Sequence, residues 1–156
     1  GDVYNRQFAE DGGTCRAPMA AGILEEQVLN RPVEVLSRGL VVLFPEPLNQ
    51  KAEAVMISNG LKSEGFMSEQ ITEEDITDNT LILTMSEESR QKIFELFPNV
   101  EKEDVAVLTE FVGDELEILN PYGGNLQAYG ICYETLNKSI KKLVKILNEG
   151  EEKCQK

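Results

Sequence analysis

A short segment near the N-terminus combines the residue types that a phosphate-binding turn needs. A helical pattern with Pro18 in its first turn follows this segment, which reads Glu10-Asp11-Gly12-Gly13-Thr14-Cys15-Arg16. A glycine-rich turn that enters a helix points backbone N–H groups and the positive helix end at an anion, and an arginine can hold two anion oxygens at once. These residues predict an anion site made by Gly12, Gly13, Thr14, Cys15 and Arg16. The alternative is an ordinary strand-to-helix connection that contains two glycines.

The composition limits the chemistry that such a site could perform. The 156 residues include no histidine, which excludes Ser-His-Asp and Cys-His catalysis and zinc sites built from histidine. The cysteines, Cys15, Cys132 and Cys154, are too few and too scattered for a disulfide framework. Any chemistry must therefore come from carboxylates, thiols, hydroxyls, arginine or backbone amides, and we expect no metal and no cofactor.

The charge balance bears on partners. The chain has 28 acidic and 15 basic side chains and a net charge of -13, which opposes binding to nucleic acid and to anionic membranes. It contains neither a long apolar run nor a signal-peptide pattern. We therefore expect a cytoplasmic protein without a nucleic-acid or membrane partner.

The positions of the apolar residues predict the elements that would hold the site. Short extended runs alternate with segments of helical period, which indicates one α/β domain over residues 1–148 and a frayed polar tail over 149–156. Strands are predicted at 3–9, 33–37, 80–85 and 104–108. Helices are predicted from 16 through 28, at 49–59, 86–97 and 126–147, with a short helical turn at 72–75.

The chain resembles the low-molecular-weight protein tyrosine phosphatase family over nearly its whole length. The family loop reads Cys-x5-Arg-Ser-Pro-Met-Ala, and residues 16–20 here read Arg-Ala-Pro-Met-Ala. Other matches are Asn49-x-Lys51-Ala52, residues 81–85 (Leu-Ile-Leu-Thr-Met), and Asn-Pro-Tyr-Gly-Gly at 120–124, where the family has Asp-Pro-Tyr-Gly-Gly. The resemblance implies a four-stranded parallel twisted sheet of order 2-1-3-4 with helices on both faces. The Thr14-Cys15-Arg16 ending is similar to the bacterial branch that includes protein arginine phosphatases, in which this threonine favours phosphoarginine.

The resemblance also implies roles for particular positions. In the family the first loop cysteine is the nucleophile, the loop arginine holds the phosphoryl oxygens, and the aspartate before Pro-Tyr-Gly-Gly is the general acid. Here the nucleophile position is Glu10 and the general-acid position is Asn120, so no catalytic residue is expected to be intact. A carboxylate is a hard, weak nucleophile, and an amide cannot donate a proton as a carboxylic acid does. Three further family residues, the loop asparagine, the serine after the arginine and a histidine, correspond to Gly13, Ala17 and Phe66.

Glu10 allows two interpretations. Its side chain either points to solvent as a neutral replacement, or it folds into the loop and accepts the hydrogen bonds that a phosphate would accept. We favour the second, because unpaired N–H groups in a closed loop are costly and a tethered anion pairs them without loss of translational freedom. Cys15 lies directly beside Arg16, so we expect it to be a packed or redox-sensitive thiol rather than a substitute nucleophile.

A pocket rim is expected at Leu40, Phe66 and Tyr122. Tyr122 resembles an aromatic residue that lines the family's pocket. The apolar run from Leu40 to Phe44 falls where the family has a loop beside the pocket mouth. We expect this run to pack in the core or to form an extra edge strand, whereas exposure would indicate a surface for protein binding or dimerisation.

The leading hypothesis is a pseudophosphatase that binds a protein, a phosphoprotein or a phosphate-like anion, with Arg16 and the loop amides as anchors. One alternative is a working phosphatase for phosphotyrosine or phosphoarginine, which would use Glu10 or Asp11 covalently or would activate water. A second alternative is a purely structural interaction module whose loop is permanently plugged by Glu10.

Overall fold

The four strands form one parallel sheet in the order β2-β1-β3-β4. The computed structural model describes residues 3–150. The strands are β1 (Tyr4–Glu10), β2 (Val33–Gly39), β3 (Thr80–Thr84) and β4 (Val105–Val107). Both the four predicted strands and their predicted order are therefore confirmed.

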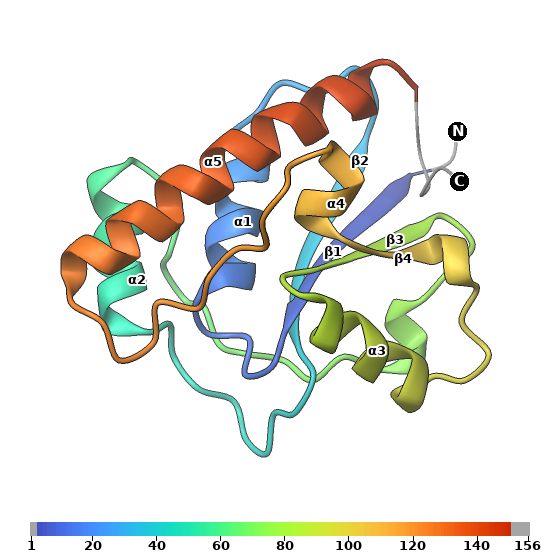
Figure 1. Ribbon diagram of the computed structural model, residues 1–156, viewed down its shortest axis with the longest axis horizontal. Coiled ribbons are helices and arrows are strands. Elements are labelled where there is room, and N and C mark those ends of the chain that lie inside the picture. Colours follow the sequence, from blue (N-terminus) through green and yellow to red (C-terminus); the bar gives the residue numbers. More distant parts are fainter. Residues whose placement is uncertain (1–2, 151–156) are drawn as a thin grey trace.

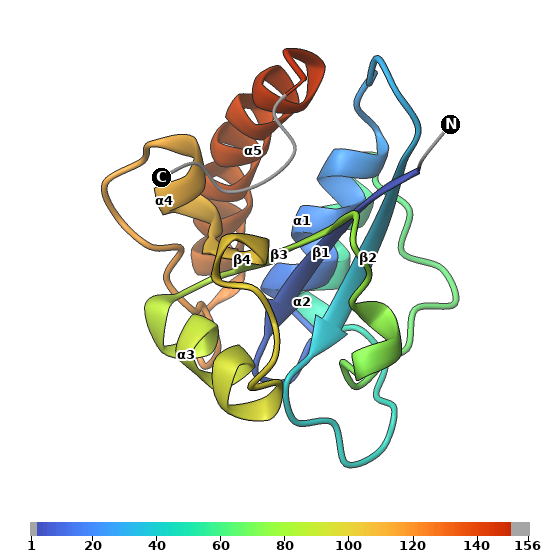
Figure 2. The same cartoon turned by 90° about the vertical axis from the view of Figure 1, so that its right-hand side faces the viewer.

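Helices cover both faces of this sheet, as Figures 1 and 2 show. The helices α1, α2 and α5 lie together on one face, where α5 packs against both of the others, and α3 packs against β3 and β4 on the other face. Their bounds are α1 (Arg16–Glu25), α2 (Gln50–Ser58), α3 (Glu87–Leu96), α4 (Leu108–Val112) and α5 (Leu126–Asn148). Two short 3₁₀ helices are η1 (Glu73–Asp75) and η2 (Lys102–Asp104).

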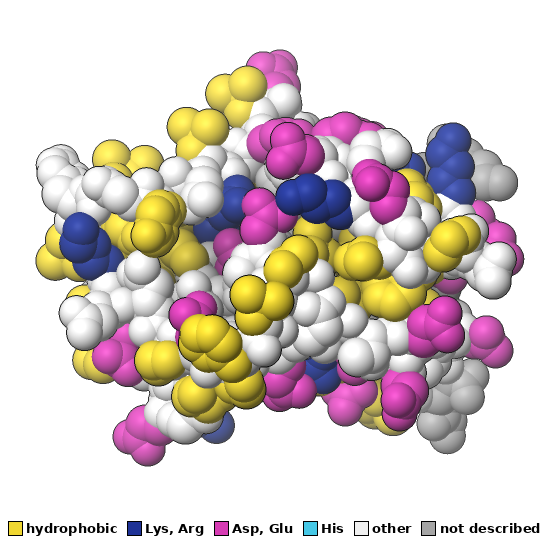
Figure 3. Space-filling model, turned by 90° about the horizontal axis from the view of Figure 1, so that it is seen from below, with side chains coloured by type: hydrophobic (Ala, Val, Ile, Leu, Met, Phe, Trp, Pro, Cys, Tyr) yellow, Lys and Arg dark blue, Asp and Glu magenta, His cyan; other side chains and the backbone are white. Residues whose placement is uncertain are grey.

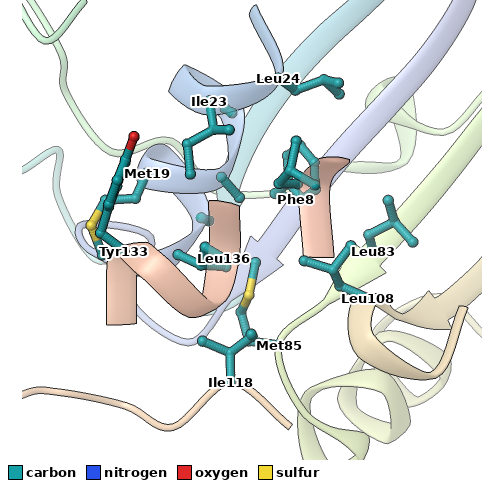
Figure 4. Close-up of a cluster of buried hydrophobic side chains, with 14 of the residues drawn as sticks. Phe8, Met19, Ile23, Leu24, Leu83, Met85, Leu108, Ile118, Tyr133 and Leu136 are labelled. Atoms are coloured by element: carbon teal, nitrogen blue, oxygen red, sulfur yellow. The ribbon is translucent and has the colours of Figure 1, made fainter. Parts of the chain in front are cut away.

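The alternation of side chains along the strands makes two hydrophobic cores. Phe8, Leu81 and Leu83 face the larger core with α1 and α5, while Ala9 and Ile82 face the smaller core with α3. Figure 4 shows part of the larger core, in which Phe8, Met19, Ile23 and Leu136 lie between β1, α1 and α5. Because both faces of the sheet are covered, the central strand β3 is a mainly apolar run that is buried throughout.

Short polar side chains begin the helices where the sequence predicts them. The Asn49 side chain accepts hydrogen bonds from the backbone N–H groups of Lys51 and Ala52 at the start of α2. The Ser86 side chain accepts one from the N–H group of Ser89 at the start of α3, and Asn125 caps α5 in the same way. These caps pair N–H groups that a helix cannot pair internally.

The first helix is shorter than predicted. It ends at Glu25, and Val28, which was expected on its apolar stripe, is 87% exposed. The following segment is held by the C-terminal end of α5 instead, because the backbone N–H and side-chain amide of Asn30 both donate hydrogen bonds to Asn148. The helix α4 was not predicted: the expected strand at 104–108 ends at Val107, and Leu108 begins the helix.

A polar contact connects the end of α4 to α5. The Asp114 carboxylate accepts a hydrogen bond of 2.6 Å from the Ser139 hydroxyl and forms an ion pair with Lys142. Burial alone would raise the pKa of Asp114, but the hydrogen bonds from Lys142 and Ser139 outweigh it and lower this pKa below its usual value.

Most of the predicted tail lies outside the described residues, and so does Cys154. Within residues 3–150, no helix has the length and apolar character that crossing a membrane requires.

Candidate functional site

The predicted anion loop, residues 11–15, connects β1 to α1 at the carboxyl edge of the sheet (Figure 1). Neighbouring segments hold its backbone. The Asp11 carbonyl accepts hydrogen bonds from the N–H groups of Leu40 and Val41, and the Thr14 carbonyl accepts one of 3.0 Å from the N–H group of Asn49. Ligands bind at this edge in parallel α/β sheets, so the loop lies where a site is expected.

Gly13 and Gly39 allow two backbone segments to approach closely beside the loop. Gly13 has a φ of +73°, and a Cβ atom added there would lie 2.9 Å from the backbone of Gly39. A Cβ atom added at Gly39 would in turn lie 2.9 Å from the carbonyl oxygen of Gly12. Gly12 itself has open space around it, so the requirement for glycine in this turn rests on Gly13.

Glu10 is the last residue of β1, and its side chain turns into the loop. One carboxylate oxygen, Oε2, accepts hydrogen bonds from the backbone N–H groups of Cys15 at 3.1 Å and Ala17 at 2.7 Å. The other oxygen, Oε1, lies 3.4 Å from Nε of Arg16, and Glu10 is 4% exposed. The carboxylate is thus a buried anion paired with a cation and with N–H groups at the start of α1, an arrangement that a helix N-terminus favours.

Arg16 has a second partner far away in the sequence. Its Nη1 atom donates a 2.6 Å hydrogen bond to the backbone carbonyl of Ile118, in the segment between α4 and α5. Since Arg16 is only 7% exposed, its guanidinium lies between the loop carboxylate and this segment. Arg16 therefore connects the loop to residues 113–125.

Cys15 is a buried thiol that contributes its backbone N–H, not its sulfur, to the contacts of Glu10. Burial, assisted by the negative charge of Glu10, raises the pKa of Cys15 far above its usual value. Burial likewise raises the pKa of Cys132, on α5, to about 12. Neither sulfur is therefore a thiolate near neutral pH, and only a thiolate is a good nucleophile.

Asn120 and Tyr122, two residues predicted at the site, lie on the exposed segment that precedes α5. The Asn120 side-chain oxygen accepts a hydrogen bond of 3.1 Å from the backbone N–H of Tyr122, which stabilises a local turn. The Tyr122 side chain is 80% exposed. Asn120 thus has a turn-forming role for its amide, and the Tyr122 ring lies largely in solvent.

The prediction that Leu40 lies at a pocket rim is wrong. Leu40 directly follows β2 and is 1% exposed, because its side chain packs in the smaller core between the sheet and α3. Beyond it, Val41, Leu43 and Phe44 are 62%, 89% and 66% exposed and form no strand. The expected core packing or edge strand is therefore limited to Leu40, and the rest of the run is an exposed apolar loop.

Phe66 is half-buried and packs against the larger core. It lines a cavity of about 260 Å³ beside β2, together with Pro18, Gly22 and Met67. Loop residues 11–15 do not line this cavity. In Figure 3, which views the molecule from below Figure 1, hydrophobic side chains form several separate clusters on the face toward which the segment between β2 and α2 projects.

Two contacts of the loop were not predicted from the sequence. The Ala17 N–H group makes the shorter of the two hydrogen bonds to Glu10, and the Ile118 carbonyl holds Arg16. The first could have been inferred from the open N–H groups in the first turn of any helix. The second joins residues 102 positions apart in the sequence, and no local pattern indicates it.

The parallel sheet covered by helices, with a glycine-rich loop and an arginine at the start of α1, defines an α/β protein whose candidate site lies at the carboxyl edge of the sheet. The family model described as "Low molecular weight phosphotyrosine protein phosphatase" matches residues 7–153. The chain belongs to this family.

Named relatives lie in its bacterial branch. A protein-arginine-phosphatase of Geobacillus stearothermophilus is 32% identical over 145 residues, which cover 92% of this chain and 96% of the relative. The low molecular weight protein-tyrosine-phosphatase PtpB of Staphylococcus aureus is 33% identical over 140 residues, which cover 90% and 96%. The structure of the YwlE arginine phosphatase from Geobacillus stearothermophilus superposes with a TM-score of 0.86 at 31% identity and covers 94% of each chain.

Proposed function

We propose that this chain is a catalytically inactive member of the family that acts by binding a protein partner. The observation that carries the proposal is the Glu10 carboxylate, which accepts the N–H groups of Cys15 and Ala17 and pairs with Arg16. A carboxylate held in this way takes donors that a bound phosphoryl group would need. We therefore propose that Glu10 plugs the loop, which favours binding of a protein over binding of a phosphorylated ligand.

The other groups near the loop support the loss of catalysis. Burial keeps the Cys15 thiol protonated, so it does not replace a nucleophilic thiolate. Asn120 stands at the position of the general acid, whose contribution is typically about 10²–10⁴-fold in rate. Asp11 is exposed and pairs with Lys92 at 3.2 Å, which is ordinary surface behaviour for a turn carboxylate.

Turnover by the purified protein tests this proposal. An aryl phosphate and phosphoarginine are offered to the native chain, to Arg16→Ala, and to a double variant that combines Glu10→Cys with Asn120→Asp. We expect no turnover above background from the native chain and from Arg16→Ala, and measurable turnover from the double variant. Turnover by the native chain that Arg16→Ala abolishes would overturn the proposal and would establish a phosphatase with non-standard chemistry.

Anion binding distinguishes a plugged loop from an open one. Phosphate and vanadate are titrated into the native chain and into Glu10→Ala by calorimetry. We expect binding only to Glu10→Ala, since removing the carboxylate leaves the N–H groups and Arg16 to the added anion. Tight binding to the native chain without turnover would contradict the plug and would favour a phosphorylated ligand instead.

A further inference from the structure

An apolar groove lies between the segment that follows α4 and the first half of α5. Figure 1 shows this segment, in orange, running from α4 to the start of α5. The groove has a volume of about 720 Å³. Its lining consists of residues 115–121 on one side and Ala128, Ile131, Cys132 and Thr135 of α5 on the other.

Large apolar side chains of this groove face solvent. Leu116, Leu119 and Ile131 are 79%, 83% and 62% exposed. Exposed aliphatic side chains that gather around a hollow, rather than scattering singly, are typical of a binding surface. Their burial by a partner would be favourable at roughly 25 cal/mol for each Å² of apolar surface removed from water.

The wall of the groove is held in place from behind. The Ile118 side chain is 2% exposed and lies beside Met85 in the larger core (Figure 4), and its carbonyl accepts the hydrogen bond from Arg16. The Glu117 carboxylate accepts a 2.7 Å hydrogen bond from the backbone N–H of Glu87, at the start of α3. These contacts fix the segment before any partner arrives, which lowers the cost of ordering it on binding.

The charges at the groove select among possible partners. Both charged residues in its lining, Glu115 and Glu117, are acidic, and Glu115 is exposed. A second copy of this chain would bring another net charge of -13 to the contact, which opposes self-association. A segment with basic residues beside an apolar anchor is complementary to both features of the groove.

We propose that this groove binds a segment of a partner protein in which aliphatic side chains are flanked by lysine or arginine. Aliphatic anchors pack between Leu116, Leu119 and Ile131, and the flanking cations lie near Glu115. This binding mode rests on the proposed binding function. It also gives Arg16 a positioning role, because this side chain supports the groove through Ile118.

The test uses the full chain and a labelled synthetic amphipathic helix of leucine and lysine, with fluorescence anisotropy as the readout. Two comparison peptides replace every leucine by serine or every lysine by glutamate. We expect the leucine–lysine peptide to bind at least about tenfold more tightly than either comparison peptide, a ratio that corresponds to about 1.4 kcal/mol. Equal binding of the serine–lysine peptide would reduce the interaction to general charge attraction and would overturn the proposal.

Matched variants locate the binding. Ile131→Ser on α5 is compared with Ile57→Ser on α2, because these side chains are 62% and 61% exposed. Glu115→Lys is compared with Glu95→Lys, an exposed glutamate on α3 that carries the same charge change. We expect the groove variants to weaken binding about tenfold and the control variants less than about twofold. Equal effects at the groove and control positions would refute the assigned location.

The outcome is independent of the phosphatase assay. If the leucine–lysine peptide binds with the expected preference and the native chain also turns over phosphate substrates, the proposal of an inactive site is refuted and the groove proposal stands. If neither turnover nor peptide binding is detected, the proposal of an inactive site stands and the proposed partner of the groove is refuted.

Discussion

Replacement of Glu10 by alanine tests the occupied loop most directly. The change removes a buried carboxylate and leaves two backbone N–H groups and the Arg16 guanidinium without that partner. Hydrogen bonds to a charged group contribute about 1.5–3 kcal/mol each, and removing one member of a buried ion pair costs about 3–5 kcal/mol. These values describe the same charge and are not additive. We expect Glu10→Ala to lose about 3–5 kcal/mol of unfolding free energy, and Glu10→Gln, which keeps an acceptor oxygen, to lose less.

Phosphate should reverse part of this loss in the Glu10→Ala variant. A ligand that binds only the folded state stabilises it by RT ln(1 + [L]/Kd), which is about 2.7 kcal/mol when its concentration is 100 times Kd. We therefore expect millimolar phosphate to raise the urea midpoint of Glu10→Ala and to leave that of the native chain unchanged. Sodium chloride at the same ionic strength controls for screening.

Urea unfolding followed by circular dichroism measures both effects, provided that the slope with denaturant stays constant. Asp11→Ala is the matched control, since Asp11 neighbours Glu10 but forms only a surface ion pair with Lys92. Such pairs contribute about 0–1 kcal/mol. Equal stability of Glu10→Ala and Asp11→Ala, or equal stabilisation of the native chain and Glu10→Ala by phosphate, would refute the reasoning.

Three further measurements test the loop glycines, the two buried thiols and the Asp114 contact. Gly13→Ala should lower the unfolding free energy by about 1–3 kcal/mol because of its positive φ, whereas Gly12→Ala should change it by less than about 1 kcal/mol; urea unfolding of the pair decides. Cys15 and Cys132 should resist alkylation by iodoacetamide at about pH 8 until urea is added, because burial raises both pKa values. Peptide mapping by mass spectrometry measures the alkylation, and rapid alkylation of the folded chain would contradict this prediction. Asp114→Asn should cost about 1 kcal/mol at neutral pH. Because folding lowers the pKa of Asp114, the stabilisation by its carboxylate is complete above the unfolded pKa of about 4 and is lost as the pH falls through the folded pKa. A stability difference between the native chain and Asp114→Asn that persists in acid would contradict this assignment.

The fold could be predicted from the sequence because local patterns and tertiary packing agree over most of the chain. The apolar run at Thr80–Thr84 is buried throughout, and Asn49 and Ser86 cap the helices that they precede. The failures occur where distant residues decide the local structure. The segment after α1 is held by Asn30, which donates hydrogen bonds to Asn148 of α5, and the burial of Leu40 depends on a core completed by residues from β3 and α3.

Part of the site could also be predicted from the sequence, because it depends on local patterns. A glycine turn before a helix indicates N–H donors, and a carboxylate at the end of the preceding strand is an anion within reach of them. The sequence left two orientations open for Glu10, and the packing of Cys15, Arg16 and Ala17 around its carboxylate selects the inward one. The connection from Arg16 to Ile118 depends on how α4 and α5 are joined in space, so it required the structure.

The arrangement of Arg16 links the proposed loss of catalysis to the proposed binding surface. One side of its guanidinium faces the Glu10 carboxylate, and Nη1 holds the carbonyl of Ile118. A phosphoryl group that entered the loop would compete with the tethered carboxylate for the N–H groups of Cys15 and Ala17. With Glu10 in place, Arg16 is compensated without a ligand and remains available to support Ile118. We therefore propose that the Glu10 carboxylate both competes with anions at the loop and, through Arg16, helps to hold the wall of the groove.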